Sequence, residues 1–315
     1  MNFKGIIKGL HHITATVNDA QEDYDFYTKL LGQRLVKETV NFDNEKVYHF
    51  YYGNEIGSPS TIFTTFPYKD QGVRDGIIGS GQVFETVFSA PANSLQYWED
   101  RLKKHNVDVS KANLFGKKKL TFKDPSGLNL AIIEDGEDER SPVWKSDEVP
   151  TGQNIIGIHH VVLAIENVEE TLKFLEVFGY ESTQKEGDFT LLNSSIGGAG
   201  NSLVVMDAKG LPEGKNGLGT VHHVAHRVES IDESLKIKDY LENELNLKVT
   251  EVKDRKYFQS IYFRIPGGVL FEIATEGPGF MVDESNKELG SSLKLPDWQE
   301  ERRAEIEAGL LDYER

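Results

Sequence analysis

Three histidine pairs are the residues whose type and spacing most directly suggest chemistry in this chain of 315 residues. They occur in "GLHHITATVNDAQE", "GIHHVVLAIENVEE" and "TVHHVAHRVESIDE", and together they contain six of the nine histidines. The chain has no cysteine, so a bound metal ion could have only nitrogen and oxygen ligands. Such ligands suit Fe(II), and also Mn(II), Co(II) or Zn(II). The pairs therefore indicate a candidate site for a divalent metal ion.

Strand alternation indicates which histidine of each pair faces a binding cavity. Neighbouring residues of a β-strand project to opposite faces. After the first pair, the apolar residues alternate in phase with His11, whereas Thr14 is in phase with His12. The apolar face must pack against the helix that follows, so His12 is predicted to point to the polar, concave side. The same reasoning selects His160 and His223 in the other two pairs.

The segment "QSIYFRIPGGVLFEIA" predicts a hairpin that adds a carboxylate to the concave side. A three-residue loop at Pro-Gly-Gly would place Tyr262 directly opposite Glu272. Two imidazoles and one carboxylate form the 2-His-1-carboxylate ligand set, which leaves positions open on an octahedral ion. Glu272 and His223 would supply two of these ligands. The residues alone leave the third ligand open, because both His12 and His160 qualify.

The same segments predict the elements that position these side chains. Two kinds of residue recur at fixed distances after each pair. The first is typical of helix N-caps and is Asp19, Asn167 or Ser230. The second is a capping-box glutamate, Glu22, Glu170 or Glu233. Each pair is thus expected on a strand followed by a helix, and strand-like runs follow each helix. A fourth stretch fits the plan without a histidine pair. We expect four β-α-β-β-β units, at about 5–66, 80–135, 155–207 and 220–276.

These units predict an α+β protein in which four βαβββ modules form two cupped-sheet domains. The first domain is expected at 8–136 and the second at 155–277, with an acidic, proline-containing linker at 137–154 between them. A C-terminal tail follows at 278–315, with a helix expected to start near Asp297.

Composition and charge restrict the class of partner. The chain is 38% hydrophobic and 27% charged, which is ordinary for a globular protein. Its formal net charge of −16 argues against nucleic acid or an anionic membrane as a partner, since both are polyanions. No run approaches the roughly 18 apolar residues of a membrane helix, and the N-terminus lacks a signal-peptide pattern. We therefore expect a cytoplasmic protein that binds a small molecule, and a homo-oligomer is compatible with these features.

Long stretches of the chain resemble a known family. The segments "LHHITATVNDAQEDYDFYTKLLGQRLVKETVNFD", "YHFYYGNEIGSPSTIFTTFP" and "DRKYFQSIYFRIPGGVLFEIATEGPGF" are similar to ring-cleaving dioxygenases that act on hydroquinones, including methylhydroquinone and chlorinated ones. These enzymes belong to the vicinal-oxygen-chelate superfamily, with glyoxalases, extradiol dioxygenases and bleomycin-resistance proteins. The resemblance implies Fe(II) bound by His12, His223 and Glu272, in a cavity formed by the first and fourth modules. In catechol-type relatives the first ligand would be His160 instead, so the resemblance favours His12.

The resemblance also implies an activity and supporting residues. It implies an Fe(II)-dependent, extradiol-type dioxygenase that inserts O₂ next to a metal-bound phenolic hydroxyl of a hydroquinone, with catechols as further substrates. Tyr262 and Arg255 would hydrogen-bond the substrate oxygen or its developing negative charge. His222 or His11 would shuttle a proton near neutral pH, and Thr14 would have a supporting role. The loop around Arg255 is shorter than in chlorohydroquinone-cleaving members, which leaves the substituents of the substrate ring open.

Two other functions fit the same fold. One is a glyoxalase-like isomerase or lyase, in which the metal ion chelates paired oxygens of the substrate. The other is a quinone- or drug-binding resistance protein without catalysis, an interpretation that the complete ligand set disfavours. Degradation of aromatic compounds and detoxification of quinones are both compatible with the predicted dioxygenase.

Overall fold

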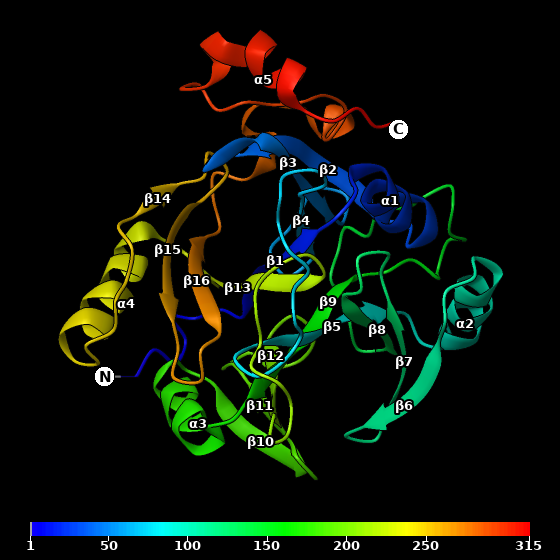
Figure 1. Ribbon diagram of the computed structural model, residues 1–315. Helices are drawn as coiled ribbons and strands as arrows, with labels where there is room; N and C mark the ends of the chain where they lie inside the picture. Colours follow the sequence, from blue (N-terminus) through cyan, green and yellow to red (C-terminus); the bar gives the residue numbers. More distant parts are fainter. Residues whose placement is uncertain (1) are drawn as a thin grey trace.

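Two β-sheets form the framework of the computed structural model, which describes residues 2–315 (Figure 1). The first and fourth modules contain the strands β1 (Leu10–Val17), β2 (Arg34–Asn41), β3 (Asn44–Gly53), β4 (Ile62–Pro67), β13 (Thr220–Val228), β14 (Lys253–Asp254), β15 (Gln259–Arg264) and β16 (Leu270–Thr275). The second and third modules contain β5 (Gln82–Ala90), β6 (Ser110–Leu114), β7 (Lys117–Lys123), β8 (Asn129–Glu134), β9 (Gly157–Ile165), β10 (Glu181–Glu186), β11 (Phe189–Asn193) and β12 (Ser202–Asp207).

Helices follow the first strand of every module, as the sequence predicts. They are α1 (Ala20–Tyr24) with the π-helical turn η1 (Asp25–Leu30), α2 (Leu95–Lys104), α3 (Val168–Val177) and α4 (Ile231–Asn243). The C-terminal segment adds the 3₁₀ turns η2 (Phe280–Val282), η3 (Asn286–Glu288) and η4 (Glu300–Arg302), and the helix α5 (Arg303–Gly309). The predicted α+β class, with four βαβββ modules in cupped sheets, is confirmed.

Each sheet combines one module from each half of the chain. The first sheet has the strand order β14-β15-β16-β13-β1-β4-β3-β2, and the second has the order β10-β11-β12-β9-β5-β8-β7-β6. Module one thus shares a sheet with module four through the antiparallel pair β1 and β13, and β5 pairs with β9 in the same way. The division of the chain into domains at 8–136 and 155–277 stays a prediction, because each of these ranges contributes strands to both sheets.

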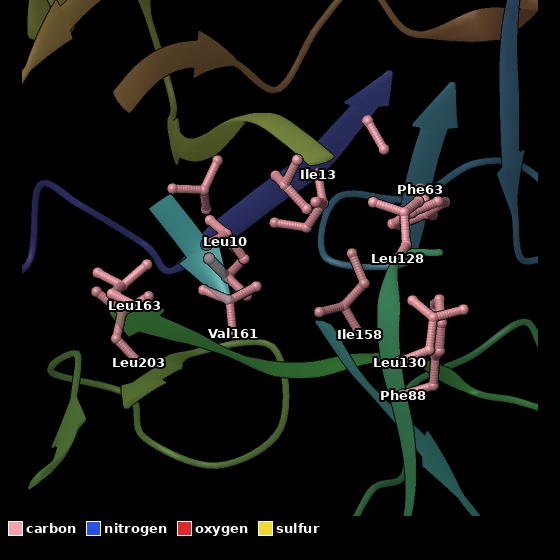
Figure 2. Packing of buried hydrophobic residues seen from close by; sticks show 14 of the residues in the cluster. Leu10, Ile13, Phe63, Phe88, Leu128, Leu130, Ile158, Val161, Leu163 and Leu203 are labelled. Carbon is pink, nitrogen blue, oxygen red and sulfur yellow. The ribbon is translucent and has the colours of Figure 1, made fainter. Parts of the chain in front are cut away.

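A continuous hydrophobic core lies behind the central strands of both sheets. Figure 2 shows part of it, with Leu10 and Ile13 of β1 and Val161 and Leu163 of β9 among the labelled side chains. Ile13 and Val161 each follow a histidine pair, and both are fully buried. Because side chains alternate along a strand, burying these residues in the core turns the second histidine of each pair towards the opposite face.

Helix capping agrees with the sequence at two of the three expected positions. The Asp19 carboxylate accepts hydrogen bonds from the backbone N–H groups of Gln21 and Glu22, and the Ser230 hydroxyl accepts one from Glu233. Asn167 makes no such bond, because its side-chain amide instead donates to the Glu170 carboxylate. The helix α3 therefore begins where expected, but without the predicted cap.

The C-terminal segment returns to the first module and lies over β2 and β3, where it is drawn in red in Figure 1. Its helix begins at Arg303, later than the predicted start near Asp297. The difference arises because the chain first forms a turn, in which the Gln299 N–H donates to the Pro296 carbonyl. Within the described residues, no helix is long and apolar enough to cross a membrane.

Candidate metal centre

Three potential ligand atoms converge on the concave face of the first sheet. The Nε2 atoms of His12 on β1 and His223 on β13 are 3.2 Å apart. Glu272 Oε2 on β16 is 3.2 Å from the first of these nitrogens and 2.8 Å from the second. All three side chains are buried. They meet because β1, β13 and β16 are adjacent, with Thr14 opposite His223 in the register of the first two strands.

These distances fit one triangular face of an octahedral metal ion. Ligands bonded at about 2.1 Å in neighbouring octahedral positions lie about 3.0 Å apart, whereas tetrahedral ligands would lie about 3.4 Å apart. Glu272 Oε2 is also fully buried and receives no hydrogen bond, although both nitrogens lie within 3.2 Å of it. A buried oxygen without a donor is rare in folded proteins and calls for a partner. The donor set and its spacing therefore suit a divalent cation.

The charge state of the carboxylate also suits a cation. Burial by itself raises the pKa of Glu272, but its contacts with the imidazoles of His12 and His223 hold that pKa well below its usual range. The second carboxylate oxygen, Oε1, accepts a hydrogen bond from the Ser260 hydroxyl. Ser260 therefore fixes the orientation of the carboxylate and leaves Oε2 directed at the two imidazoles.

The first histidine of each pair contacts the second through their Nδ1 atoms. These atoms are 2.9 Å apart between His11 and His12, and 2.8 Å apart between His222 and His223. Burial lowers the pKa of His11 and of His222 to about 3, so both rings are neutral. A neutral ring can accept a hydrogen bond from the N–H at Nδ1 of its neighbour, which leaves Nε2 of His12 and His223 with free lone pairs.

The hairpin β15–β16 has the register that the sequence predicts. Tyr262 lies opposite Glu272, and the Ile265 N–H donates to the Val269 carbonyl across the turn. The Tyr262 hydroxyl accepts a hydrogen bond from Arg255 Nε at 3.1 Å. Burial raises the pKa of Tyr262 above its usual range, so the hydroxyl keeps its proton and can donate it.

A cavity of about 450 Å³ opens beside the three ligand atoms. Its walls are largely aromatic and carry several polar groups, and they include His12, His49, Tyr51, Phe66, His222, His223, Arg255, Phe258 and Tyr262. A larger groove, of about 1180 Å³, lies elsewhere on the surface around Phe26 and Phe122 and contains none of these ligands. The smaller cavity is the one in which a substrate could meet a bound metal ion.

Two predicted supporting residues lie behind the cavity wall. Neither Thr14 nor His11 is among the residues that line the cavity, and both are buried. Thr14 instead accepts a hydrogen bond from the Thr64 hydroxyl at 2.9 Å. The ring of His11 packs against Phe258, with 5.0 Å between the ring centres.

His49 is a cavity residue that the sequence reasoning missed. It lies on β3, and its Nε2 is 2.9 Å from the Thr64 hydroxyl oxygen. Since the Thr64 proton is donated to Thr14, His49 must be the donor in this contact. Its signal in the sequence was its alternation with Tyr51, which lines the same cavity, but His49 belongs to no histidine pair.

His160, the alternative first ligand, lies on β9 in the second sheet. The structure does not bring it together with His223 and Glu272. Among residues 2–315, the group of three potential ligands that does converge is His12, His223 and Glu272.

The comparisons with known proteins agree with this fold. A family model described as the Glyoxalase/Bleomycin resistance protein/Dioxygenase superfamily matches residues 9–132 and 157–273. The chain is 45% identical to the "Putative ring-cleaving dioxygenase MhqE" of Bacillus subtilis, over 95% of this chain and 97% of the relative. It is 38% identical to the chlorohydroquinone/hydroquinone 1,2-dioxygenase of Sphingobium indicum, over 92% of this chain and 91% of the relative.

A solved structure has the same fold as this chain. The crystal structure of a "putative dioxygenase" from Bacillus subtilis matches with a TM-score of 0.93 and 43% identity, and the match covers 98% of both chains. The predicted enzyme class, an oxygen-incorporating ring-cleaving dioxygenase, is confirmed by relatives of that class at 35% to 45% identity. The chain therefore belongs to the Glyoxalase/Bleomycin resistance protein/Dioxygenase superfamily.

Proposed function

We propose that the chain is an Fe(II)-dependent, extradiol-type dioxygenase that cleaves the ring of hydroquinones, with catechols as further substrates. The observation that carries this proposal is the convergence of His12, His223 and Glu272, spaced like one face of an octahedron, beside an aromatic cavity. The 38% identical relative named for hydroquinone cleavage supports the choice of substrate. The cytoplasmic location and a homo-oligomeric state stay predictions.

His12, His223 and Glu272 would hold the metal ion beside the cavity. When bound there, Fe(II) supplies Lewis acidity towards an ionised hydroxyl and a path for electrons between an aromatic ring and O₂. Glu272 contributes one negative charge to the site, and Ser260 keeps its carboxylate oriented. The Nδ1 contacts to His11 and His222 keep the two imidazoles in the tautomer that can bind a cation.

Tyr262 and Arg255 are the groups that would bind a substrate oxygen. Because the Tyr262 oxygen already accepts the Arg255 N–H, its own proton is free for an acceptor in the cavity. The guanidinium of Arg255 adds a fixed positive charge, which favours negative charge that develops on a phenolic oxygen. Both donors come from neighbouring chain segments, with Tyr262 on β15 and Arg255 just after β14.

His222 is better placed than His11 to contact a substrate. It lines the cavity, whereas His11 lies behind the wall. Because Nδ1 accepts a hydrogen bond from His223, the neutral His222 ring carries its own proton on Nε2, on the far side of the ring from that contact. A ring whose pKa burial lowers to about 3 takes up no proton at neutral pH, so the predicted proton shuttle is wrong for both histidines. We therefore assign hydrogen-bond donation towards the substrate to His222 and orientation of His12 to His11.

Oxygen uptake tests the proposed function. Protein loaded with Fe(II) under anaerobic conditions should consume O₂ when hydroquinone or methylhydroquinone is added, and ¹⁸O₂ should label the ring-opened product. His160→Ala lies outside the site and should retain activity, whereas His12→Ala should lose both bound iron and activity. Absence of O₂ uptake with hydroquinones and catechols, in protein shown to hold iron, would sink the dioxygenase proposal in favour of an isomerase, a lyase or a binding protein.

A further inference from the structure

The second sheet forms its own cavity, which the proposed reaction does not use. This second cavity has a volume of about 360 Å³, within the usual range for small-molecule sites. Its apolar walls come from Leu114, Phe115, Ile133, Leu191 and Ile196, and its polar groups are Lys117, Lys119, Asp135, Glu137, Gln184, Asn193, Ser202 and the histidine pair His159 and His160.

The two sheets have corresponding strand orders and registers, so each residue of the metal centre in the first sheet has a counterpart in the second sheet. His160 on β9 corresponds to His12, because both are the second histidine of a pair at the start of the central strand. In the first sheet His223 pairs with Thr14, which is two residues after His12. In the second sheet Glu85 pairs with Val162, which is two residues after His160. Glu85 therefore takes the place of His223.

The counterpart of Glu272 in the second sheet cannot bind a metal ion. The strand pairing that brings Glu272 beside β13 brings Ala131 beside β5. Glu85 itself forms an ion pair with Lys119, so its carboxylate is neutralised by an ammonium group. His160 is the only member of the three-ligand set that the second cavity retains.

A chain of hydrogen bonds fixes the tautomer of His160. Asp135 Oδ2 is 3.1 Å from His159 Nε2, and His159 Nδ1 is 2.7 Å from His160 Nδ1. The His159 contact holds the pKa of Asp135 below its usual range, so this carboxylate only accepts and His159 carries its proton on Nε2. Lys117 lies 3.4 Å from the same carboxylate and forms an ion pair with it.

The consequence is an unpaired acceptor in a buried position. With its proton on Nε2, His159 accepts at Nδ1 a hydrogen bond from the N–H of His160 Nδ1, and this leaves a lone pair on His160 Nε2. That nitrogen is buried and has no hydrogen-bond partner, and His160 as a whole is only 5% exposed. Burial lowers the pKa of His160 well below its usual range, so the ring stays neutral at physiological pH. A buried acceptor without a donor is destabilising, and a ligand with a hydroxyl group would supply the missing hydrogen bond.

We propose that the second cavity binds a small phenol, whose hydroxyl donates to His160 Nε2 while its ring lies against Phe115, Ile133 and Leu191. The lone pair selects a hydrogen-bond donor, and the apolar walls select a flat hydrophobic body. A phenol bound here would not be cleaved, since the counterparts of His223 and Glu272 are an ion-paired glutamate and an alanine. The site is therefore separate from the proposed reaction and does not depend on it.

Fluorine NMR on the metal-free full-length protein tests this proposal with 4-fluorophenol and 4-fluoroanisole. The two probes share the ring, but the methyl ether cannot donate a hydrogen bond. We expect 4-fluorophenol to bind at least fivefold more tightly than 4-fluoroanisole, in the wild-type protein and equally in His12→Phe. His160→Phe keeps a ring of similar size and should weaken 4-fluorophenol binding at least tenfold.

The ¹⁵N spectrum of histidine-labelled protein provides a readout that needs no variant. The signal of His160 Nε2 should move upfield when 4-fluorophenol is added, as expected for an unprotonated nitrogen that gains a hydrogen bond. Equal affinity for the two probes, or unchanged affinity in His160→Phe, would overturn the proposal. So would loss of all 4-fluorophenol binding in His12→Phe, since this would place the phenol at the metal centre. Retention of Zn(II) by Glu272→Ala, but not by Glu272→Ala with His160→Phe, would make the ligand a metal ion instead.

Discussion

Tyr262 and Glu272 are direct cross-strand partners in the hairpin β15–β16, and both side chains lie beside His223. One turn thus positions a proposed metal ligand and a proposed substrate-binding hydroxyl together. The two side chains nevertheless differ in what their removal should change. Glu272 should govern the metal content of the protein, and Tyr262 should govern the rate of the reaction at constant metal content.

Glu272→Gln should lower the bound metal content more than tenfold, because it removes the negative charge and puts an amide beside the two imidazoles. In the metal-free state the same variant should be as stable as the wild type or about 1 kcal/mol more stable. The reason is that a glutamine N–H can donate to His223 Nε2, which lies 2.8 Å from the present carboxylate oxygen. Elemental analysis and chemical unfolding in EDTA measure the two effects.

Glu276→Gln is the matched control for this prediction. Glu276 is exposed and lies 3.8 Å from Arg227 in a loose ion pair, so its neutralisation should change neither metal content nor stability appreciably. An unchanged metal content in Glu272→Gln would contradict the assignment of this residue as a ligand.

Tyr262→Phe should reduce kcat/KM for a hydroquinone by about 10²–10³-fold, the usual effect of removing one donor that stabilises developing negative charge. Bound iron should remain at the wild-type level, because the Tyr262 hydroxyl contacts Arg255 and not the ligand atoms. Steady-state kinetics with a parallel iron assay measures both quantities. Tyr240→Phe, on α4 and outside the cavity, is the control, and equal kinetics for the two variants would argue against the proposed role of Tyr262.

Much of the candidate site could be predicted because strand alternation is a local property. The period of two residues selected His12 and His223, and the Pro-Gly-Gly turn set the register of Glu272. The pairing of modules is not local, since β1 and β13 are separated by some two hundred residues of sequence. Only the family resemblance distinguished His12 from His160, because both occupy equivalent positions in equivalent modules.

Other features were missed because they depend on contacts between distant segments. His49 carries no repeat signal, and only the folded sheet shows that Thr64 lies between it and Thr14. Alternation placed Thr14 on the concave face, but its hydroxyl is hydrogen-bonded to that of Thr64 on the adjacent strand, and neither residue lines the cavity. The C-terminal segment is a further case, because its contacts with β2 are not visible in its own sequence.

Lys37→Met should destabilise the protein by about 3–5 kcal/mol, as is usual when one partner of a buried ion pair is removed. Lys37 on β2 is fully buried and joins the C-terminal segment through Asp283, at 2.5 Å, and through the buried Glu284. Its loss leaves the buried Glu284 with only Lys294, at 4.0 Å, as a cationic partner. Urea unfolding measures the change, and adding Glu284→Gln to the variant should restore part of the stability. Additive losses in the double variant would contradict a coupling between the two residues.

Asp23→Asn should remove a pH-dependent loss of stability. Asp23 is buried, with Oδ2 accepting hydrogen bonds from the Tyr52 hydroxyl at 2.8 Å and the Thr65 hydroxyl at 2.6 Å. Its other oxygen has no partner, and burial raises the pKa of this carboxyl from 3.8 to about 8. The folded state therefore holds a proton that the unfolded state releases above pH 3.8. The stability linked to this proton is complete below pH 3.8 and is lost as the pH rises towards 8.

The size of this effect follows from the same pKa shift. Between pH 4 and pH 8 the wild type should lose up to about 1.4 kcal/mol of stability per pH unit relative to Asp23→Asn, which cannot ionise. Chemical unfolding of both proteins across this range gives the difference directly, and subtraction cancels other titrating groups that the two share. Asp147→Asn, at an exposed position, should show no such trend. A difference that stays constant from pH 4 to pH 8 would mean that Asp23 is ionised in the folded protein, with its charge stabilised by the two hydroxyl donors.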